Sequence, residues 1–363
     1  MGFRCGIVGL PNVGKSTLFN ALTRAAVQAE NYPFCTIEPN AGMVEVPDPR
    51  LYTIADLVHP AKVVPAVMEF VDIAGLVSGA SQGEGLGNRF LAHIREVDAI
   101  AHVVRCFEDV DVTHVANRVD PLADVQTIEI ELALADLATV EGALHRAEKA
   151  SRSGDKEQRH LMDLYQRTHE WLEAGSAVRN MELDPQDRSV IKTLCLLTDK
   201  PVLYIANVAE GDSRGNAWID TLRPHVEREG AEIVLISAAI EQEIAALDDH
   251  DREAFLQELG LEESGLDRVI RAGYRLLSLQ TFFTAAEKEA KAWTVRTGMR
   301  AAQAAGVIHS DFERGFIRAE TIGYEDYVRY GGEQGARDAG RLRLEGKEYV
   351  LNDGDIMHFR FNV

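Results

Sequence analysis

The N-terminal part of the chain alternates short apolar runs with amphipathic stretches. Apolar runs at 3–9, 67–72 and 100–104 have the length and hydrophobicity of strands that are buried on both faces. A helical pattern follows the first run, and two further runs of the same kind lie at 201–207 and 232–237. Alternating strands and helices predict an α/β domain with a mostly parallel sheet.

A long helical pattern interrupts this alternation. Apolar residues recur there at the three-four spacing typical of a coiled-coil seam. The seam residues are Ile130, Ala133, Leu137, Val140, Leu144 and Ala147. Residues 151–155 break the pattern, a second helix is predicted over 161–172, and Asp184 and Pro185 have the residue types of a helix N-cap and first position. We therefore predict a helical coiled-coil hairpin, over 128–197, inserted into the α/β domain.

The C-terminal part of the chain has a different pattern. Strand-like runs lie at 281–283, 292–295 and 316–322. Two short apolar runs flank the turn sequence Asn-Asp-Gly at 352–354, which is typical of a β-hairpin. We predict a small α+β domain over 278–363, so that the α/β domain consists of 1–127 and 198–277.

A phosphate-binding motif follows the first predicted strand. Residues 9–16 have the sequence GLPNVGKS, a complete GxxxxGK[ST] motif between a strand and a helix. Its glycines let backbone N–H groups surround phosphates, and the helix N-terminus adds its positive dipole. We expect Lys15 to reach the β- and γ-phosphates and the Ser16 hydroxyl to bind Mg²⁺. The expected nucleotide contacts are Asn12, Val13, Gly14, Lys15, Ser16 and Thr17.

Three further residues complete the expected triphosphate site. Asp72 and Gly75 form a DxxG sequence after the strand at 67–72, where Asp72 would hold Mg²⁺ through water and the Gly75 N–H would contact the γ-phosphate. Thr36 lies between the two motifs in the chain, and its hydroxyl would complete the Mg²⁺ shell. The order of these elements predicts an Mg²⁺-dependent nucleoside triphosphate site.

The segment expected to contact the base favours ATP over GTP. GTPases of this architecture use an N/TKxD sequence, whose aspartate accepts two hydrogen bonds from guanine. Here the strand at 201–207 ends in Asn207, Val208 replaces the lysine, and Glu210 is one methylene longer than aspartate. Asn207 would still bind a purine N7, while Ser237 and Ala238 form the loop on the other side of the base. Because a displaced carboxylate weakens selection of guanine, adenine is the expected base.

Composition and charge narrow the classes of partner. The formal net charge of −20 disfavours non-specific nucleic-acid binding, and DNA is not an expected partner. No apolar run approaches the roughly 18 residues that cross a bilayer, so no membrane association is expected. Four scattered cysteines form no CxxC pair and indicate reduced thiols in the cytoplasm.

Several segments together resemble the YchF/Obg-like ATPase family over essentially the whole chain. They are GLPNVGKST, NYPFCTIEPN, DIAGLVSGASQGEGLGNRFL, NVAE and EQGARDAGRLRLEGKEYVLNDGDIMHFRFN. The resemblance implies a P-loop domain of the translation-factor class (G-domain-like), an inserted coiled-coil domain and a C-terminal TGS domain of β-grasp shape. It also implies a preference for ATP, read by an NxxE segment, and an association with ribosomes.

Hydrolysis in such a protein needs a group that orders the attacking water. Leu76 stands where many GTPases have the water-orienting glutamine, and the resemblance implies this hydrophobic replacement. Two candidates remain: His114, which family members are thought to use, and Asn12, since an asparagine at this position coordinates K⁺ in related P-loop proteins. Redox sensitivity of family members makes Cys35, next to Thr36, a candidate sensor.

Three readings of function remain open from the sequence. The favoured one is an Mg²⁺-dependent ATPase that acts as a nucleotide switch on the ribosome (large subunit or 70S-type particle) and contacts its RNA through basic residues of the helical hairpin. These basic residues are His145, Arg146, Lys149, Arg152, Lys156, Arg159 and Arg167. The second reading is an ATP-gated ribosome adaptor whose turnover is incidental, and a GTPase is a third, less favoured one.

Overall fold

The structure, a computed structural model, describes residues 3–24, 40–73, 86–109, 118–151 and 155–362. Its contacts divide the chain into two units. We call residues 3–42 with 69–273 the first unit, and residues 43–68 with 274–363 the second unit. The second unit thus combines the C-terminal part of the chain with a segment from the middle of the predicted P-loop domain.

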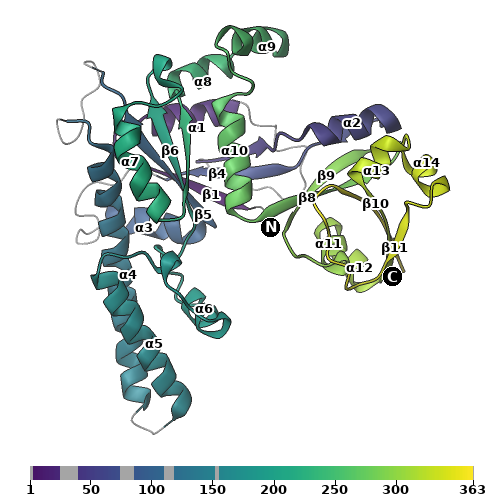
Figure 1. Cartoon of the computed structure of the whole chain (residues 1–363). Helices are drawn as coiled ribbons and strands as arrows, with labels where there is room; N and C mark the ends of the chain where they lie inside the picture. The colour runs from purple at the N-terminus through teal and green to yellow at the C-terminus, as the bar shows by residue number, and fades with distance from the viewer. Residues whose placement is uncertain (1–2, 25–39, 74–85, 110–117, 152–154, 363) are drawn as a thin grey trace. The chain divides into compact units, whose positions relative to one another are not determined.

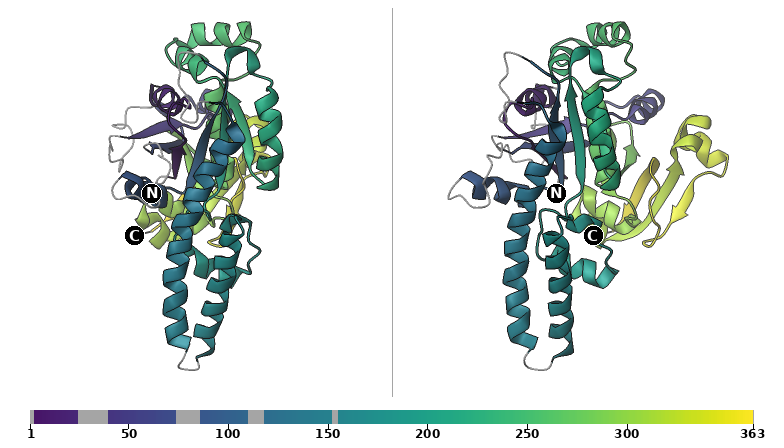
Figure 2. Two further views of the ribbon diagram at one scale, coloured as in Figure 1. Left: turned by 90° about the vertical axis from the view of Figure 1, so that its left-hand side faces the viewer. Right: turned by 60° about the vertical axis from the view of Figure 1, so that its left-hand side comes forward.

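A six-stranded, mostly parallel sheet forms the centre of the first unit (Figure 1). Its spatial order is β2 (Ala41–Glu45), β4 (Val67–Asp72), β1 (Arg4–Val8), β5 (Ala99–Cys106), β6 (Val202–Val208) and β7 (Glu232–Ile236). β1 pairs in parallel with β4 and β5, and β6 pairs in parallel with β5 and β7. Every residue of β5 and β6 is buried, as expected for strands with helices on both faces of the sheet (Figure 2). The predicted α/β fold with a mostly parallel sheet is confirmed.

Seven helices of the described residues surround this sheet. They are α1 (Lys15–Arg24), α3 (Leu86–Glu96), η3 (Glu210–Asp212), α7 (Ala217–Arg228), α8 (Ala238–Ile244), α9 (Asp249–Glu258) and α10 (Gly265–Leu276). Helix α1 begins directly after the loop that follows β1, and α8 begins directly after β7. Helices α1 and α8 pack against each other, which brings these two loops to the same edge of the sheet.

The inserted segment forms the predicted helical hairpin, which projects from the sheet (Figure 1). It consists of α4 (Pro121–Ser151), α5 (Lys156–Glu173), η2 (Val178–Asn180) and α6 (Pro185–Lys192). The Asp184 carboxylate caps α6 and Pro185 is its first residue, as predicted. Val140, Leu164 and Ile191 lie in the shared core of the hairpin. The seam prediction is wrong for Ile130, which is 58% exposed. In this part of α4 the buried face of the helix carries Ile128 and Leu132 instead.

A buried carboxylate joins this hairpin to the sheet. Asp136 of α4 is fully buried and accepts hydrogen bonds from the Leu197 N–H (2.8 Å), the Thr198 N–H (2.8 Å) and the Thr198 hydroxyl (2.7 Å). These residues lie just before β6, where the chain returns from the hairpin. Cys195, which the apolar residues around it in the sequence predict to be buried, is exposed at a turn where its own backbone is left-handed (φ 50°).

The second unit is built on a mixed sheet whose inner face packs against short helices. Its strand order is β11 (Arg343–Glu345), β10 (Phe316–Gly323), β12 (Asp355–Phe361), β8 (Leu279–Ala285), β9 (Ala290–Arg296) and β3 (Val63–Val64). Its helices are α2 (Pro49–Val58), α11 (Ala301–Ile308), α12 (Ser310–Arg314), α13 (Tyr324–Arg329) and α14 (Glu333–Asp338). Phe282, Ala304 and Phe359 lie in its core, and the α+β class predicted for this part of the chain is confirmed.

The predicted hairpin around 352–354 is wrong. β12 pairs with β10 and β8, while β11 pairs with β10. The turn closes against β8 instead: the Gly354 N–H donates to the Thr281 carbonyl (2.8 Å), and the Asp353 carboxylate accepts from the Thr281 N–H (2.8 Å). Long-range hydrogen bonds of the turn therefore override the local hairpin pattern.

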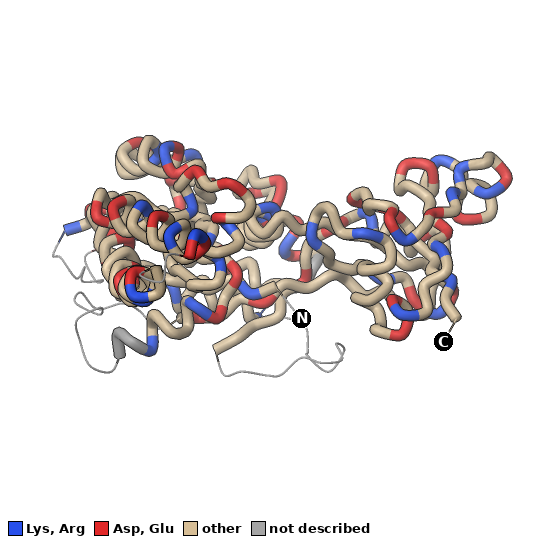
Figure 3. The backbone as a smooth tube through the Cα atoms, turned by 90° about the horizontal axis from the view of Figure 1, so that it is seen from below, with Lys and Arg blue, Asp and Glu red and all other residues tan. Residues whose placement is uncertain are grey.

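Acidic and basic residues are interleaved along both units in the described chain (Figure 3). The net charge of −20 is therefore spread over the chain rather than gathered in one acidic segment. Among the described helices, none is long and apolar enough to cross a membrane.

Candidate nucleotide site

The loop between β1 and α1 has the close packing that its glycines predict. A Cβ on Gly9 would lie 2.7 Å from the Val103 carbonyl oxygen, and one on Gly14 would lie 2.2 Å from Asn207 Nδ2. Gly14 also has φ +92°, a conformation that side chains disfavour. Asn12 takes a left-handed conformation (φ 64°) at the exposed crest of the loop. The loop is thus held against β5 and β6 with no room for larger residues.

Lys15 joins this loop to the end of β4. Its Nζ lies 2.9 Å from Asp72 Oδ1 and 2.8 Å from the Ile73 carbonyl oxygen. Ser16 is exposed in the first turn of α1. The structure therefore brings together the lysine and the carboxylate that the sequence placed 57 residues apart.

Asn207 occupies the centre of this edge of the sheet. Its side chain is 4% exposed, its Nδ2 donates to the Val13 carbonyl (2.9 Å), and its Oδ1 accepts from the Ala238 N–H (3.0 Å). One amide thereby joins the phosphate loop to the start of α8. Both polar atoms are engaged within the protein, which gives Asn207 a scaffolding role beside the predicted contact to a base.

A cavity of about 680 Å³ opens beside Asn207 at the carboxyl ends of β5, β6 and β7. Its lining residues are Asn12, Gly14, Thr17, Phe107, Glu108, Asp109, Asn207, Val208, Ala209, Glu210, Gly211, Ser237, Ala238 and Ala239. Crevices outside the carboxyl ends of parallel strands are the usual ligand sites of open α/β sheets. The structure thus brings most of the predicted base and phosphate contacts around one hollow of suitable size.

The lining also contains residues that the sequence analysis missed. These residues are Phe107, Glu108 and Asp109, which directly follow β5. Because ligands bind outside the carboxyl ends of parallel strands, their position after a predicted strand could have identified them. Among the described residues of the lining, three carry carboxylates (Glu108, Asp109 and Glu210) and none is a lysine or an arginine. A polyphosphate at this edge therefore depends on Lys15, on backbone N–H groups and on a metal ion for its counter-charge.

The predicted base-reading residues take distinct environments. Val208 is buried at the end of β6, whereas Glu210 is exposed in η3. Ser237 is the N-cap residue of α8 without a side-chain cap bond, so its hydroxyl is not used by the helix. Ala238 is buried, and its N–H binds Asn207.

Four predicted residues lie outside the described residues. They are Thr36, Gly75, His114 and the candidate redox residue Cys35. Leu76 also lies outside them. Their predicted roles therefore rest on the sequence.

The donors present suit Mg²⁺ rather than a softer metal. The Ser16 hydroxyl and the Asp72 carboxylate offer oxygen donors at the start of α1 and the end of β4. Mg²⁺ takes one or two protein oxygens together with waters and substrate phosphates. Within the described ranges no group of three or more His, Cys, Asp or Glu residues could hold a metal ion.

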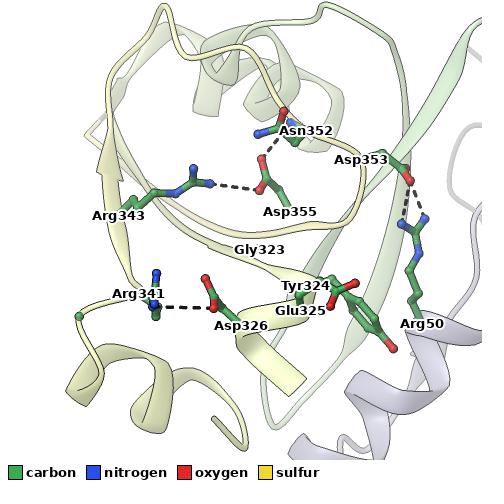
Figure 4. A pocket seen from close by; sticks show the side chains of 11 residues that line it. Arg50, Gly323, Tyr324, Glu325, Asp326, Arg341, Arg343, Asn352, Asp353 and Asp355 are labelled. Carbon is green, nitrogen blue, oxygen red and sulfur yellow. Dashed lines mark hydrogen bonds and ion pairs between the residues drawn. The ribbon is translucent and has the colours of Figure 1, made fainter. Parts of the chain in front are cut away.

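A second cavity, of about 610 Å³, lies within the second unit (Figure 4). Its lining residues are Arg50, Gly323, Tyr324, Glu325, Asp326, Gly340, Arg341, Arg343, Asn352, Asp353 and Asp355. The arginines are paired with carboxylates: Arg50 with Asp353 (2.7 Å) and Arg343 with Asp355 (3.3 Å). Since these pairs satisfy one another, the lining presents no excess of positive charge toward an anion.

Comparison with protein families gives two matches. A family model described as "50S ribosome-binding GTPase" matches residues 4–136. The model of the YchF-GTPase C-terminal region, described as "Protein of unknown function (DUF933)", matches residues 279–362. The two models therefore cover the phosphate loop and most of the second unit.

Curated relatives match over the full length of both chains. The chain is 58% identical over 363 residues to "Ribosome-binding ATPase YchF" of Haemophilus influenzae, covering 100% of both chains. Proteins of the same name from Escherichia coli O157:H7 and Bacillus subtilis are 55% and 53% identical, again over 100% of both chains.

Two solved structures extend this comparison. The structure titled "Structure of the Schizosaccharomyces pombe YchF GTPase" is 36% identical, with a TM-score of 0.90, and the match covers 99% of this chain and 98% of that one. A GTP-binding protein from Pyrococcus horikoshii, 19% identical with a TM-score of 0.59 over 99% of this chain and 100% of that one, shares the fold.

Proposed function

Because the chain belongs to the YchF family, we propose that it is an Mg²⁺-dependent ATPase, which hydrolyses ATP to ADP and phosphate and acts as a nucleotide switch on the ribosome in the cytoplasm. The observation that carries this proposal is that Lys15, Asp72 and Asn207 lie at one edge of the sheet, beside a cavity of about 680 Å³. The names of the full-length relatives, which combine ATPase and ribosome binding, support it.

The residues of the phosphate loop would bind and orient the triphosphate. The backbone N–H groups of residues 12–17 face phosphate oxygens at the N-terminus of α1, and Lys15 exchanges Asp72 for the β- and γ-phosphates. Ser16, Asp72 and Thr36 would hold Mg²⁺, which neutralises charge on the phosphates during transfer. Gly75 would contact the γ-phosphate. Loss of that phosphate after hydrolysis would release Gly75 and return the protein from its ATP-bound to its ADP-bound state.

Adenine is the proposed base. The cavity has Val208 in place of the lysine that covers guanine in GTPases, and the Glu210 carboxylate, although it lines the cavity, is exposed in η3. Adenine requires neither group, since backbone near Val208 would accept a hydrogen bond from its amine. A GTPase is the alternative, because the similar protein from Schizosaccharomyces pombe is described as a YchF GTPase.

Calorimetric titration separates these two nucleotides. We expect ATP with Mg²⁺ to bind at least about tenfold more tightly than GTP, because a missing pair of hydrogen bonds to guanine costs that much or more. Repeating the titration with K⁺ and with Na⁺ tests the proposed contact of Asn12 to K⁺. Tighter binding of GTP would contradict the assignment.

Hydrolysis requires a group that orders water in place of the glutamine that Leu76 replaces, and we propose His114 for this role. We expect His114→Ala to lose stimulated hydrolysis while its affinity for ATP stays unchanged. Unchanged turnover would transfer the role to Asn12 with K⁺. Loss of ATPase activity with peroxide in wild type, but not in Cys35→Ser, would support the redox role of Cys35.

An ATP-gated adaptor is the second candidate, and Leu76 is the residue that favours it. Co-sedimentation with ribosomes in ATP and in a non-hydrolysable analogue distinguishes the two. A switch loses ribosomes only in hydrolysable ATP, whereas an adaptor behaves alike in both, and Lys15→Ala serves as the control without bound nucleotide. The helical hairpin over 128–197 and the TGS domain over 278–363 are the proposed ribosome contacts, with RNA of the large subunit or the 70S-type particle as partner.

A further inference from the structure

The wall of the nucleotide cavity after β5 depends on a buried arginine. Arg105 is 1% exposed, although arginine is almost never fully buried unless its charge is paired and hydrogen-bonded. Its neighbour across the sheet is Asn207, the central residue of the site. A buried guanidinium next to the cavity needs hydrogen-bond acceptors, and the backbone around the cavity supplies them.

The Arg105 side chain holds the segment that follows it. Its Nε donates to the Phe107 carbonyl (3.1 Å), its Nη2 donates to the Asp109 carbonyl (3.4 Å), and its guanidinium lies 4.7 Å from the centre of the Phe107 ring. One rigid fork thus fixes two carbonyls and one ring of the same wall. The chain continues from Asp109 toward His114, so this fork also fixes the point where that segment begins.

Asn216 ties the same wall to the opposite one. Its Nδ2 donates to the Cys106 carbonyl (2.9 Å) and to Asp212 Oδ2 (2.9 Å), and its Oδ1 caps α7 through the Trp218 and Ile219 N–H groups. Cys106 ends β5, whereas Asp212 closes η3, whose residues 210–211 line the cavity from the side of β6. The amide therefore bridges the two loops between which a base would lie.

We propose that Arg105 and Asn216 are positioning residues that preorganise the base end of the nucleotide cavity, an inference that rests on the proposed function of this site. Neither Arg105 nor Asn216 is itself a lining residue of the cavity. Each acts through backbone that does line it. Preorganised walls spare the nucleotide the entropy of ordering two loops, so their loss weakens affinity rather than the chemical step.

Asn216→Ser is the sharpest test, because serine keeps the N-cap of α7 but does not reach Cys106 or Asp212. We expect the Kd for Mg²⁺-ATP and the KM to rise about fivefold through loss of the two hydrogen bonds that join the walls, with kcat within about twofold of wild type. The melting temperature of the nucleotide-free protein should fall by only a few degrees, because the same two hydrogen bonds also contribute to folding. Thr221→Ala, on the exposed side of the same helix, is the matched control and should change nothing.

Arg105→Lys tests the other anchor while keeping a cation in place. Lysine offers a point charge instead of a planar fork, so it cannot hold both carbonyls, and we expect about a tenfold rise in Kd. An unchanged Kd in Asn216→Ser overturns the proposal, and so does a rise in Kd of the same size in the Thr221→Ala control. Asn207→Ala separates this failure from failure of the site itself: if that variant also binds ATP normally, the nucleotide lies elsewhere and the proposed function is wrong.

Discussion

The glycines at the two cavities differ in what surrounds them. Beside the nucleotide cavity a Cβ on Gly9 or Gly14 would meet backbone or the Asn207 amide within 2.7 Å. Gly323 and Gly340, which line the cavity of the second unit, have no atom within 4 Å of such a Cβ. Tight packing around glycine occurs elsewhere in the second unit, at Gly315 and Gly335, so the difference belongs to the two cavities and not to the two units. The second cavity is an open hollow between side chains that pair with one another.

Gly14→Ala should give the largest effect in this comparison. Its Cβ would lie 2.2 Å from Asn207 Nδ2 and φ is +92°, so the phosphate loop must move away from β6. We expect phosphate release from ATP to fall about a thousandfold, as when an aligned set of phosphate donors is displaced. Gly323→Ala is the matched substitution in the second unit and should leave hydrolysis unchanged. Equal effects of the two substitutions would refute the contrast.

Asp136→Ala should strongly destabilise the first unit. The substitution leaves the Leu197 and Thr198 N–H groups and the Thr198 hydroxyl buried without their acceptor, at a cost of about 4 kcal/mol in free energy of unfolding. Differential scanning calorimetry measures the loss. Asp163→Ala, at an exposed position of α5, is the control and should cost almost nothing. A wild-type melting profile for Asp136→Ala would show that the junction does not need this carboxylate.

Acid should destabilise the first unit through His102. Burial lowers the pKa of this histidine to about 4, whereas an unfolded histidine has its ordinary pKa of 6.5. The unfolded state therefore binds more protons between these two pH values, so stability is complete above pH 6.5 and declines as pH falls toward 4. The expected loss is about 3 kcal/mol by chemical denaturation. His102→Leu should flatten this part of the profile, and an unchanged slope in that variant would count against the assignment.

Asp353→Asn should have the smallest effect, because its ion pair with Arg50 is partly exposed. Asparagine keeps the acceptor for the Thr281 N–H and removes only the charge. We expect a loss of about 0.5 kcal/mol in stability of the second unit, which vanishes in 1 M salt. A loss as large as that of Asp136→Ala would mean that this partly exposed ion pair contributes as much as the buried carboxylate of the hairpin junction.

The residues that could be predicted from sequence belong to contiguous patterns. The motif at 9–16 fixed Lys15 and Gly14, and the strand that ends in Asn207 indicated the base end of the site. The same local reasoning failed at 352–354, where Asp353 and Gly354 form hydrogen bonds with Thr281 of β8. Asp353 and Thr281 are 72 residues apart in the chain. It also gave no sign that α2 and β3, from 43–68, belong with the C-terminal part of the chain, because β3 pairs with β9.

The sequence alone determined most helices and strands of this protein and the chemistry of its phosphate loop. The signals for them, which are the spacing of apolar residues, the placement of glycines and the adjacent Lys15 and Ser16, each involve only a few neighbouring residues. Tertiary structure decided which distant groups meet: Lys15 with Asp72, Asn207 with Val13 and Ala238, and Arg105 and Asn216 with the walls of the cavity. Those contacts depend on the order and register of parallel strands. Strand order is set by packing of the whole sheet, which no local pattern records.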